Sequence, residues 1–291
     1  MKFTHTEKIF WPKEKYTKGD VLAYYQKIAP VILPYLKGRP ESLLRTPEGL
    51  KGPGFFQKNI GRGRVPEFVQ TRTLKAPSAG KKVTYALIEN KNSLLYFVNL
   101  GCIEFNPWQS RVRSLKKPDF LTVDLDPHGR SFDDVVVVAQ HLHKTLDALG
   151  LKNYCKTSGK TGLHVLVPLG AKYTYEETRA FAKLLVQKVN ADLPELTTLE
   201  QRLAKRRGRI YLDIARNAYG QTTAAPYCLR PYPGATVSTP LLWREVTKGL
   251  RPAQFTIKTM FRRLKKKGDL FKPLLRQRAD LRRARNRLQN A

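Results

Sequence analysis

The chain has 291 residues, of which 41% are hydrophobic, so it can bury a sizeable core and is not disordered throughout. Its 54 Lys and Arg against 23 Asp and Glu give a formal net charge of +31, which favours a polyanionic partner such as a nucleic acid. We expect no membrane span, signal peptide, zinc site or disulfide framework, because long apolar runs are missing and the three cysteines are far apart.

The N-terminal part predicts one helix followed by short strands. Apolar residues on one face predict a helix over 19–36, which Pro30 and Pro34 are expected to kink or split. From 42 to 106, short apolar runs such as SLLRT, VTYALI and SLLYFVNL alternate with Gly, Pro and Asn turns. This alternation predicts an antiparallel β region.

The remainder of the chain predicts strands and helices in alternation. Ser131 and Thr174 begin capping-box patterns, which predict helices that end near Leu149 and Val189. Apolar and β-branched runs predict strands at 120–126, 154–157, 164–168 and 210–214. The basic segment from Phe261 onward is expected to be partly helical.

Two acids lie near the end of the strand predicted before Pro127. Asp124 and Asp126 are two residues apart, so both carboxylates project from the same face of the strand. Adjacent carboxylates repel one another unless a cation lies between them, and the usual cation is Mg²⁺ or Mn²⁺. The alternative is an exposed strand end with two solvated acids. Asp213, within the apolar run IYLDI, is either a third ligand of a two-metal site or the partner of a nearby arginine.

The turn over 158–162 combines a hydroxyl, a cation and backbone N–H groups between two predicted strands. Ser158 and Lys160 could therefore form part of a phosphate cradle, although a simple hairpin connection fits the same residues. The turn is not a Walker A motif, because no GxxxxGK[ST] run leads into a helix. His164 begins the next strand, where a lone histidine is more often structural than catalytic.

Two arginines and an aromatic pair could serve a nucleotide. Arg206 precedes Asp213 and Arg230 follows it, and guanidinium groups match the oxygens of a triphosphate. A solvated basic face is the competing interpretation for the run around Arg206. Phe56, next to Phe55 and beside a Gly-Pro-Gly turn, could stack on a base or fill the core.

These motifs resemble the polymerase domain of bacterial ligase D, of the archaeo-eukaryotic primase superfamily. The resemblance extends in order to about Lys267 and is carried by the runs KYTKGDVLAYYQKIAPVILPYLKGRP, KGPGFFQK, NLGCIEFNPW, DLDP, TSGKTGLHVLVPL and IYLDIARNAYGQTTAAPYCLRPYPGATVSTPL. It implies an α+β fold in which a central antiparallel, RRM-like sheet is flanked by helices. It also implies a primase/polymerase domain over 1–267, with an N-terminal 5′-phosphate-binding module over about 1–60, and a basic tail over 268–291.

The resemblance implies a template-directed nucleotidyltransferase that extends primers or fills gaps at DNA ends in non-homologous end joining. Ribonucleotides would be favoured over deoxyribonucleotides. The expected partners are DNA with 5′-phosphorylated ends or gaps and NTPs or dNTPs, with Ku and a DNA ligase as further candidates and no membrane. The expected location is the cytoplasm, in association with the nucleoid.

The resemblance also assigns roles to individual residues. Asp124, Asp126 and Asp213 match the carboxylates that bind two divalent ions, Mn²⁺ or Mg²⁺. Lys8 and Lys18 match the pair that receives a downstream 5′-phosphate. The nucleotide-binding positions are Phe56, Ser158, Lys160, His164, Arg206 and Arg230.

Three positions depart from the common family pattern. Asn106 stands where many members have His, Arg216 stands where Gln is frequent, and Lys160 is followed by Thr161 instead of directly preceding the second Gly of the turn. A rival function is a non-catalytic module that binds and bridges DNA ends through its charge alone. A phosphatase that uses Asp124 as nucleophile is a second rival, disfavoured because Pro127-His128 follows the acid pair.

Overall fold

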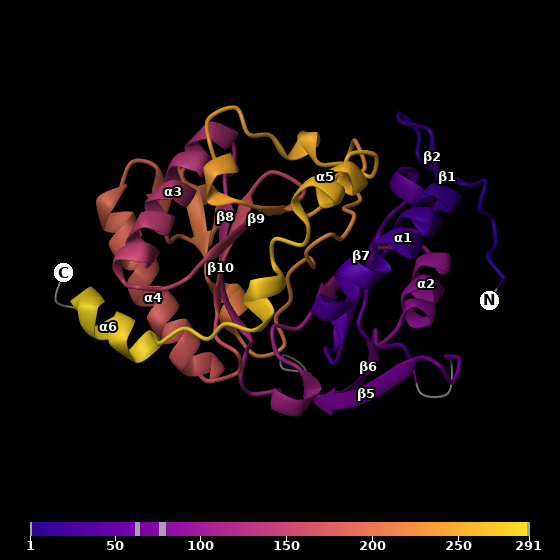
Figure 1. The fold of residues 1–291 in the computed structure, drawn as a ribbon, viewed down its shortest axis with the longest axis horizontal. Helices are drawn as coiled ribbons and strands as arrows, with labels where there is room; N and C mark the ends of the chain where they lie inside the picture. Colours follow the sequence, from indigo (N-terminus) through magenta and orange to yellow (C-terminus); the bar gives the residue numbers. More distant parts are fainter. Residues whose placement is uncertain (1, 62–64, 76–79, 290–291) are drawn as a thin grey trace.

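The computed structural model describes residues 2–61, 65–75 and 80–289 as a mixed α+β fold (Figure 1). Its helices are α1 (Lys18–Leu36), α2 (Lys91–Asn99), α3 (Phe132–Ala148), α4 (Tyr175–Asp192), α5 (Met260–Lys267) and α6 (Leu281–Gln289). Its strands are β1 (Ile9–Trp11), β2 (Tyr16–Thr17), β3 (Glu41–Arg45), β4 (Phe55–Gln57), β5 (Gln70–Lys75), β6 (Lys82–Leu87), β7 (Cys102–Pro107), β8 (Phe120–Asp126), β9 (Tyr154–Thr157), β10 (Leu163–Pro168), β11 (Thr197–Thr198), β12 (Ile210–Asp213) and β13 (Pro240–Leu241). Antiparallel sheets flanked by helices confirm the predicted fold class.

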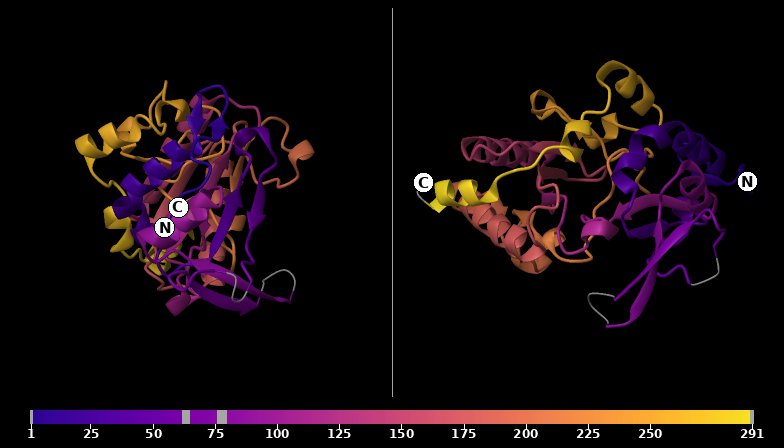
Figure 2. Two further views of the ribbon diagram at one scale, coloured as in Figure 1. Left: turned by 90° about the vertical axis from the view of Figure 1, so that its right-hand side faces the viewer. Right: turned by 60° about the horizontal axis from the view of Figure 1, so that its bottom comes forward.

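A six-stranded sheet in the order β11-β12-β8-β10-β9-β13 forms the centre of the molecule. All its neighbouring strands are antiparallel except β11 and β12. Helices α3 and α4 lie side by side on one face (Figure 2, right). In β8, Leu121, Val123 and Leu125 are fully buried, whereas Asp124 and Asp126 alternate with them and retain solvent contact. The strand therefore turns its apolar side to the helices and its acids to the other face.

The N-terminal part packs α1 and α2 against a three-stranded sheet in the order β4-β3-β7, and the β5–β6 hairpin extends from it (Figure 2). Thr17 and Asp20 form a reciprocal capping box at the start of α1. The expected split at Pro30 and Pro34 does not occur, and α1 continues through both to Leu36. Its face of buried apolar residues, Tyr25, Ile28, Ile32 and Leu36, holds the helix together by tertiary packing despite the lost hydrogen bonds.

The run SLLYFVNL, expected to be a strand, is helix α2. The Asn90 side chain accepts a hydrogen bond from the Ser93 backbone N–H at 2.9 Å, and the Ser93 hydroxyl oxygen accepts one from the Asn90 backbone N–H. Short apolar runs that are buried on several sides do not distinguish strand from helix by periodicity. The cap at Asn90 was the signal that decides the conformation.

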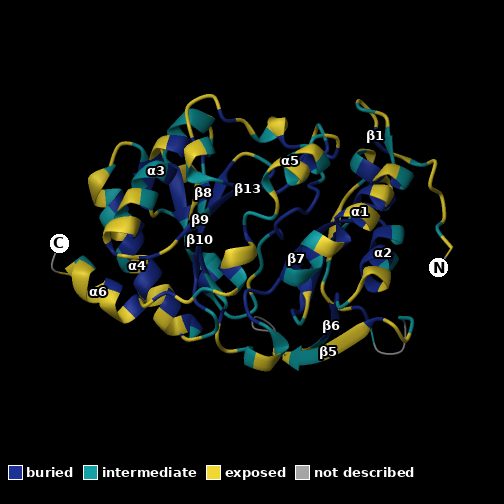
Figure 3. Ribbon diagram, in the orientation of Figure 1, coloured by how far each residue is buried: buried dark blue, intermediate teal, exposed yellow. Residues whose placement is uncertain are grey.

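Residues after β13 pack onto the rest of the chain. Helix α6 contacts α4 through the buried Leu281 and Ala284, while most other α6 residues are exposed (Figure 3). The Leu281 backbone N–H donates to the Tyr173 hydroxyl at 3.0 Å. Among the described residues, none of the helices combines the length and apolar character needed to span a bilayer.

Candidate active site

Four residues form a row across the face of the six-stranded sheet that α3 and α4 leave uncovered. Asp213 on β12 lies opposite Asp124 on β8, Asp124 lies opposite His164 on β10, and His164 lies opposite Lys156 on β9. Side chains directly opposite one another in antiparallel strands share a face. Asp126, two residues beyond Asp124, points to the same face. The strand period thus gathers three carboxylates, an imidazole and an ammonium group.

The charges of this row perturb one another. Burial and the neighbouring Asp213 charge raise the pKa of Asp124 to about 6. The Oδ1 atom of Asp124 lies 3.4 Å from Nε2 of His164. Burial, together with the Lys156 charge, holds the pKa of His164 well below its usual value, so this imidazole is neutral at pH 7.

The other two acids are each held by an arginine. Asp126 Oδ2 accepts a hydrogen bond from Arg206 Nη1 at 2.7 Å, and Asp213 Oδ2 lies 3.5 Å from Arg216 Nε. Asp213 Oδ1 also accepts the Ala215 backbone N–H at 2.7 Å. These contacts fix the orientation of both carboxylates.

The three acids suit a divalent cation by their donor chemistry. In the part of the chain that the structure describes, no three His, Cys, Asp or Glu side chains are arranged as a ready metal cluster. Carboxylate oxygens are nevertheless the donors that Mg²⁺ and Mn²⁺ prefer, and a cation would relieve the repulsion that contributes to the raised pKa of Asp124. The residues present therefore fit such an ion, and the ligand set stays a prediction.

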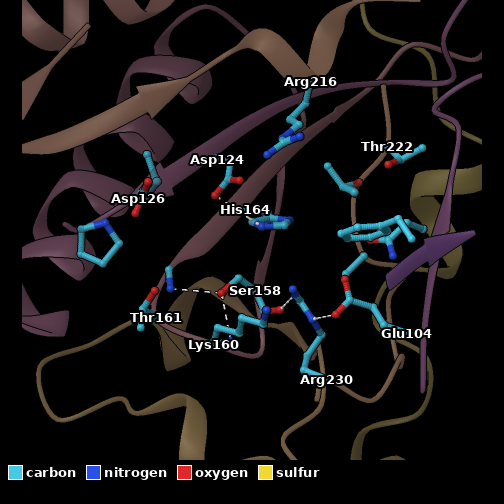
Figure 4. Close-up of a pocket in the computed structure, with 17 residues that line it drawn as sticks. Glu104, Asp124, Asp126, Ser158, Lys160, Thr161, His164, Arg216, Thr222 and Arg230 are labelled. Atoms are coloured by element: carbon cyan, nitrogen blue, oxygen red, sulfur yellow. Dashed lines mark hydrogen bonds and ion pairs between the residues drawn. The ribbon is translucent and has the colours of Figure 1, made fainter. Parts of the chain in front are cut away.

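Asp124 and His164 of the row line a cleft of about 270 Å³ between the two sheets, whereas Asp213 and Lys156 lie beside them outside its lining (Figure 4). The six-stranded sheet and its turn contribute the two acids of β8, His164 and the Ser158 turn. The three-stranded sheet contributes Phe56 from β4 and two polar residues of β7. The lining includes seven of the sequence-predicted positions, Phe56, Asp124, Asp126, Ser158, Lys160, His164 and Arg230.

The Ser158 turn presents polar groups to the cleft. The Ser158 hydroxyl oxygen accepts the backbone N–H groups of Lys160 and Gly162, each at 3.1 Å, and so closes the turn on itself. A Cβ atom on Gly162 would lie 2.3 Å from the Leu125 carbonyl oxygen, so only glycine lets the turn approach β8 this closely. Burial and the Arg230 charge lower the pKa of Lys160, which lines the same cleft.

Arg230 is fixed by a partner that the sequence analysis did not identify. Its Nε donates to Oε2 of the buried Glu104 at 2.7 Å, and its Nη1 donates to the Ser158 carbonyl oxygen. Glu104 lies on β7, in the run CIEFN, where an acid interrupts an apolar strand as Asp213 does in IYLDI. That pattern was the available signal. Asn106 on the same strand lines the cleft, and its buried Nδ2 atom has no hydrogen-bond partner among the described residues.

The structure distinguishes the two roles predicted for Phe56, stacking on a base and filling the core. Its side chain is 59% exposed at the cleft, so it does not fill the core. Phe55 is also exposed and lies against the Arg45 guanidinium group. A large exposed aromatic beside a charged cleft is available for stacking on a ligand.

Two buried cations beside the acids, Arg206 and the row residue Lys156, lie outside the cleft lining. Arg206 packs over the Tyr211 ring, 4.4 Å from its centroid, and reaches the site only through Asp126. Lys156 was not singled out from the sequence. Its Nζ donates to Ser238 Oγ at 2.5 Å, and burial together with the Arg230 charge lowers the pKa of Lys156 to about 7.

Lys8 and Lys18 line a separate pocket of about 290 Å³. Lys8 Nζ lies 2.6 Å from Oε2 of Glu48, and Lys18 Nζ donates to the Thr4 carbonyl oxygen at 2.5 Å. Burial and the Lys8 charge lower the pKa of Lys18. The structure thus brings together the two lysines that the sequence resemblance paired.

Comparison with known proteins assigns the family. A family model described as "LigD, primase-polymerase domain" matches residues 17–271. The chain is 36% identical over 271 residues to the bifunctional non-homologous end joining protein LigD of Bacillus subtilis, and 31% identical over 265 residues to the multifunctional LigD of Pseudomonas aeruginosa. These matches cover 92% and 91% of this chain but 43% and 31% of the two relatives, so the chain spans less than half of either.

A solved structure agrees with this assignment. The polymerase domain from Mycobacterium tuberculosis ligase D in complex with DNA aligns with a TM-score of 0.88 and 28% identity, over 96% of this chain and 99% of that one. The motif resemblance and the enzyme class that it implied are confirmed at the level of the family. The chain therefore belongs to the LigD primase-polymerase domain family, a family of nucleotidyltransferases.

Proposed function

We propose that this chain adds nucleotides to a primer under the direction of a template, at gaps or broken ends of DNA in non-homologous end joining. The observation that carries the proposal is the row of Asp213, Asp124 and His164. Asp124 and His164 line a cleft that also holds Lys160 and Arg230, and Asp213 lies opposite Asp124 on the neighbouring strand. Carboxylates for metal ions beside cations for phosphates are the groups that nucleotide addition requires.

Divalent metal ions are general cofactors of polymerase nucleotidyltransferases. Here Asp124, Asp126 and Asp213 would hold two of them, either Mn²⁺ or Mg²⁺. When bound, such ions would activate the primer 3′-hydroxyl and stabilise the leaving pyrophosphate. The protein's own contribution is the fixed spacing of three acids on adjacent strands, because β8 and β12 pair in the register that places Asp213 against Asp124.

The incoming nucleotide would lie with its triphosphate toward the Ser158 turn. Arg230 and Lys160 supply positive charge, and Glu104 fixes the direction of the Arg230 fork. Phe56 offers an exposed ring for the base and sugar. His164, neutral and buried beside Asp124, would position the acid and contact the nucleotide.

The DNA substrate would extend from the cleft to the pocket of Lys8 and Lys18. Their two ammonium groups suit a downstream 5′-phosphate, in an N-terminal module over about 1–60. The Mycobacterium tuberculosis relative was solved in complex with DNA, which supports a DNA ligand for this chain. We further propose Ku and a DNA ligase as partners, a preference for ribonucleotides and association with the nucleoid, as the family resemblance implies.

A gap-filling assay tests the activity. The protein is given a primer–template with a 5′-phosphorylated downstream strand, Mn²⁺, and either ribonucleotides or deoxyribonucleotides. We expect the complementary nucleotide to be added, with ribonucleotides used more efficiently, and Asp124→Ala to abolish extension. DNA binding that falls steeply with salt, without incorporation by the wild type, would instead support the non-catalytic end-bridging function.

The 5′-phosphate pocket has its own test. Lys8→Ala and Lys18→Ala are expected to weaken binding to 5′-phosphorylated gaps and to leave binding to 5′-hydroxyl gaps nearly unchanged. The 5′-phosphate adds negative charge that the two lysines of this pocket would neutralise. Equal losses on both substrates would show that these lysines are general backbone contacts.

A further inference from the structure

The C-terminal groove is a second charged depression, away from the site described above. It has a volume of about 580 Å³ and lies between the end of α3, the end of β10 and helix α6. Its polar lining comprises Lys152, Gln277, Arg278, Asp280, Arg283 and Arg287. Four of these side chains are cationic and one is acidic, so the groove is positively charged.

The four cations of the groove are available to a ligand. Lys152, Arg278, Arg283 and Arg287 are exposed, and none of them forms an ion pair within the described residues. The single acid balances only one of the four positive charges, and Asp280 Oδ1 accepts the backbone N–H groups of Arg282 and Arg283, each at 3.1 Å, at the start of α6.

Two of the arginine side chains lie against glycine residues, and this contact places them at the groove. A Cβ atom on Gly150 would lie 2.8 Å from Arg287 Nη1, and one on Gly170 would lie 2.7 Å from Arg278 Cγ. Both glycines have positive φ angles, so each turn brings its backbone close beneath the arginine. The positive charge is therefore carried by exposed side chains, two of which contact a turn of the folded surface.

The segment that carries the groove is anchored to the domain. The Ala279 backbone N–H donates to the Pro168 carbonyl oxygen at 2.7 Å, and the Tyr154 hydroxyl donates to Gln277 Oε1 at 2.6 Å. Leu281 and Ala284 are buried beside α4. Helix α6 thus keeps its apolar side on the protein and turns its arginines outward (Figure 3).

We propose that the C-terminal groove binds the phosphate backbone of a duplex DNA segment other than the one in the polymerase cleft. α6 packs against α4, on the helix-covered side of the sheet, whereas the acid row faces the opposite side. Strands β1 and β2 lie at the other end of the molecule from α6 (Figure 1), and the lysine pocket is lined by residues of that N-terminal part. One chain would therefore hold DNA at two separated places.

The chemistry of the groove favours a nucleic acid over a protein. All six cations between 276 and 287 are arginines, whose planar forks match phosphate oxygens. Protein-binding hot spots also use arginine, but they combine it with Trp and Tyr in well-packed pockets that exclude water. Here the apolar lining residues Leu149 and Ala279 are buried, and the exposed lining is charged or polar.

The test compares two double charge reversals in the full chain. Arg283→Glu/Arg287→Glu alters the groove, and Arg179→Glu/Lys183→Glu makes the same charge change at the same i, i+4 spacing on the exposed side of α4, outside the groove. Binding to a blunt, 5′-hydroxyl duplex is measured at several salt concentrations. We expect the groove variant to lose about tenfold in affinity at about 100 mM salt and its salt slope to fall by about two, because two phosphate contacts are removed. The α4 variant should change much less.

Two controls separate loss of charge from charge repulsion, and loss of groove binding from loss of polymerase activity. Arg283→Gln/Arg287→Gln should reproduce the smaller salt slope without introducing repulsion. Gap filling on a short substrate should keep its wild-type rate in every variant, so that loss of groove binding and loss of polymerase activity are separate results. Equal losses of DNA affinity in the groove and α4 variants would show that the groove contributes only through the overall charge of the protein, and would overturn the proposal. Tighter binding of an acidic polyglutamate peptide than of DNA would also overturn it.

Discussion

The acid row should make the metal-free protein less stable than a variant that lacks one of its charges. Asp124 is 20% exposed, and burial with the Asp213 charge raises its pKa from 3.8 to about 6. One pKa unit is worth about 1.4 kcal/mol, so ionised Asp124 costs the native state about 3 kcal/mol. Because the pKa is raised on folding, the cost is absent below about pH 4 and complete above about pH 6. Asp124→Asn removes it while keeping the shape of the side chain.

Urea unfolding in EDTA at several pH values measures this effect. At pH 7.5 we expect Asp124→Asn to raise the free energy of unfolding by about 2–3 kcal/mol, and at pH 4 we expect little difference. Mn²⁺ should raise the melting temperature of the wild type more than that of the variant. Asp133→Asn is the control, and it should lower the free energy of unfolding at pH 7.5, because the hydrogen bonds from Arg251 and Gly249 lower the pKa of Asp133 to about 2. A destabilised Asp124→Asn at pH 7.5 would refute the reasoning.

Three further substitutions test the surroundings of the site. Burial raises the pKa of Glu41, whose carboxylate oxygens have no hydrogen-bond partner among the described residues. Ionisation of Glu41 should therefore lower the melting temperature of the wild type as the pH rises above about 4, and Glu41→Gln should lack this decrease. Asn217→Ala should cost about 2–4 kcal/mol in urea unfolding, because the Asn217 side chain bonds both the N–H and the carbonyl oxygen of Thr122 at 2.8 and 2.7 Å. Glu104→Gln should lower the free energy of unfolding by about 3 kcal/mol in urea and raise KM for the nucleotide, because Arg230 would lose its buried carboxylate partner. An unchanged KM would show that the Glu104–Arg230 pair does not contribute to nucleotide binding.

The local part of the site could be predicted from the sequence because it depends on strand geometry. The period of two places Asp124 and Asp126 on one face wherever β8 lies. The partners of these acids depend on pairings between distant segments. Arg206 reaches Asp126 across 80 positions in the chain, and no local pattern distinguishes it from its basic neighbours. Glu104 was missed for the same reason, although an acid inside an apolar strand was already informative at Asp213.

Elements were predicted well where caps agreed with periodicity. Thr174 and Ser131 precede α4 and α3 as expected, and their side chains accept the backbone N–H groups at the third helical positions. The strand prediction for the run in α2 was wrong because apolar content alone fits either conformation, whereas the Asn90 cap indicates a helix. At the C-terminus, the spacing of Leu281 from Ala284 and Leu288 indicates an apolar helix face within an otherwise strongly basic segment.

The most direct test of the account is single-turnover addition of one complementary nucleotide into a 5′-phosphorylated gap, in Mn²⁺ and at saturating DNA. Wild type is compared with Asp124→Asn, Asp126→Asn and Asp213→Asn, and DNA binding is measured on the same samples. The account predicts retained binding and a rate that falls on the order of 10³-fold in each variant, because each change removes a carboxylate proposed to hold a catalytic metal ion. Rates within tenfold of the wild type, with binding intact, would contradict a catalytic role for the acid row.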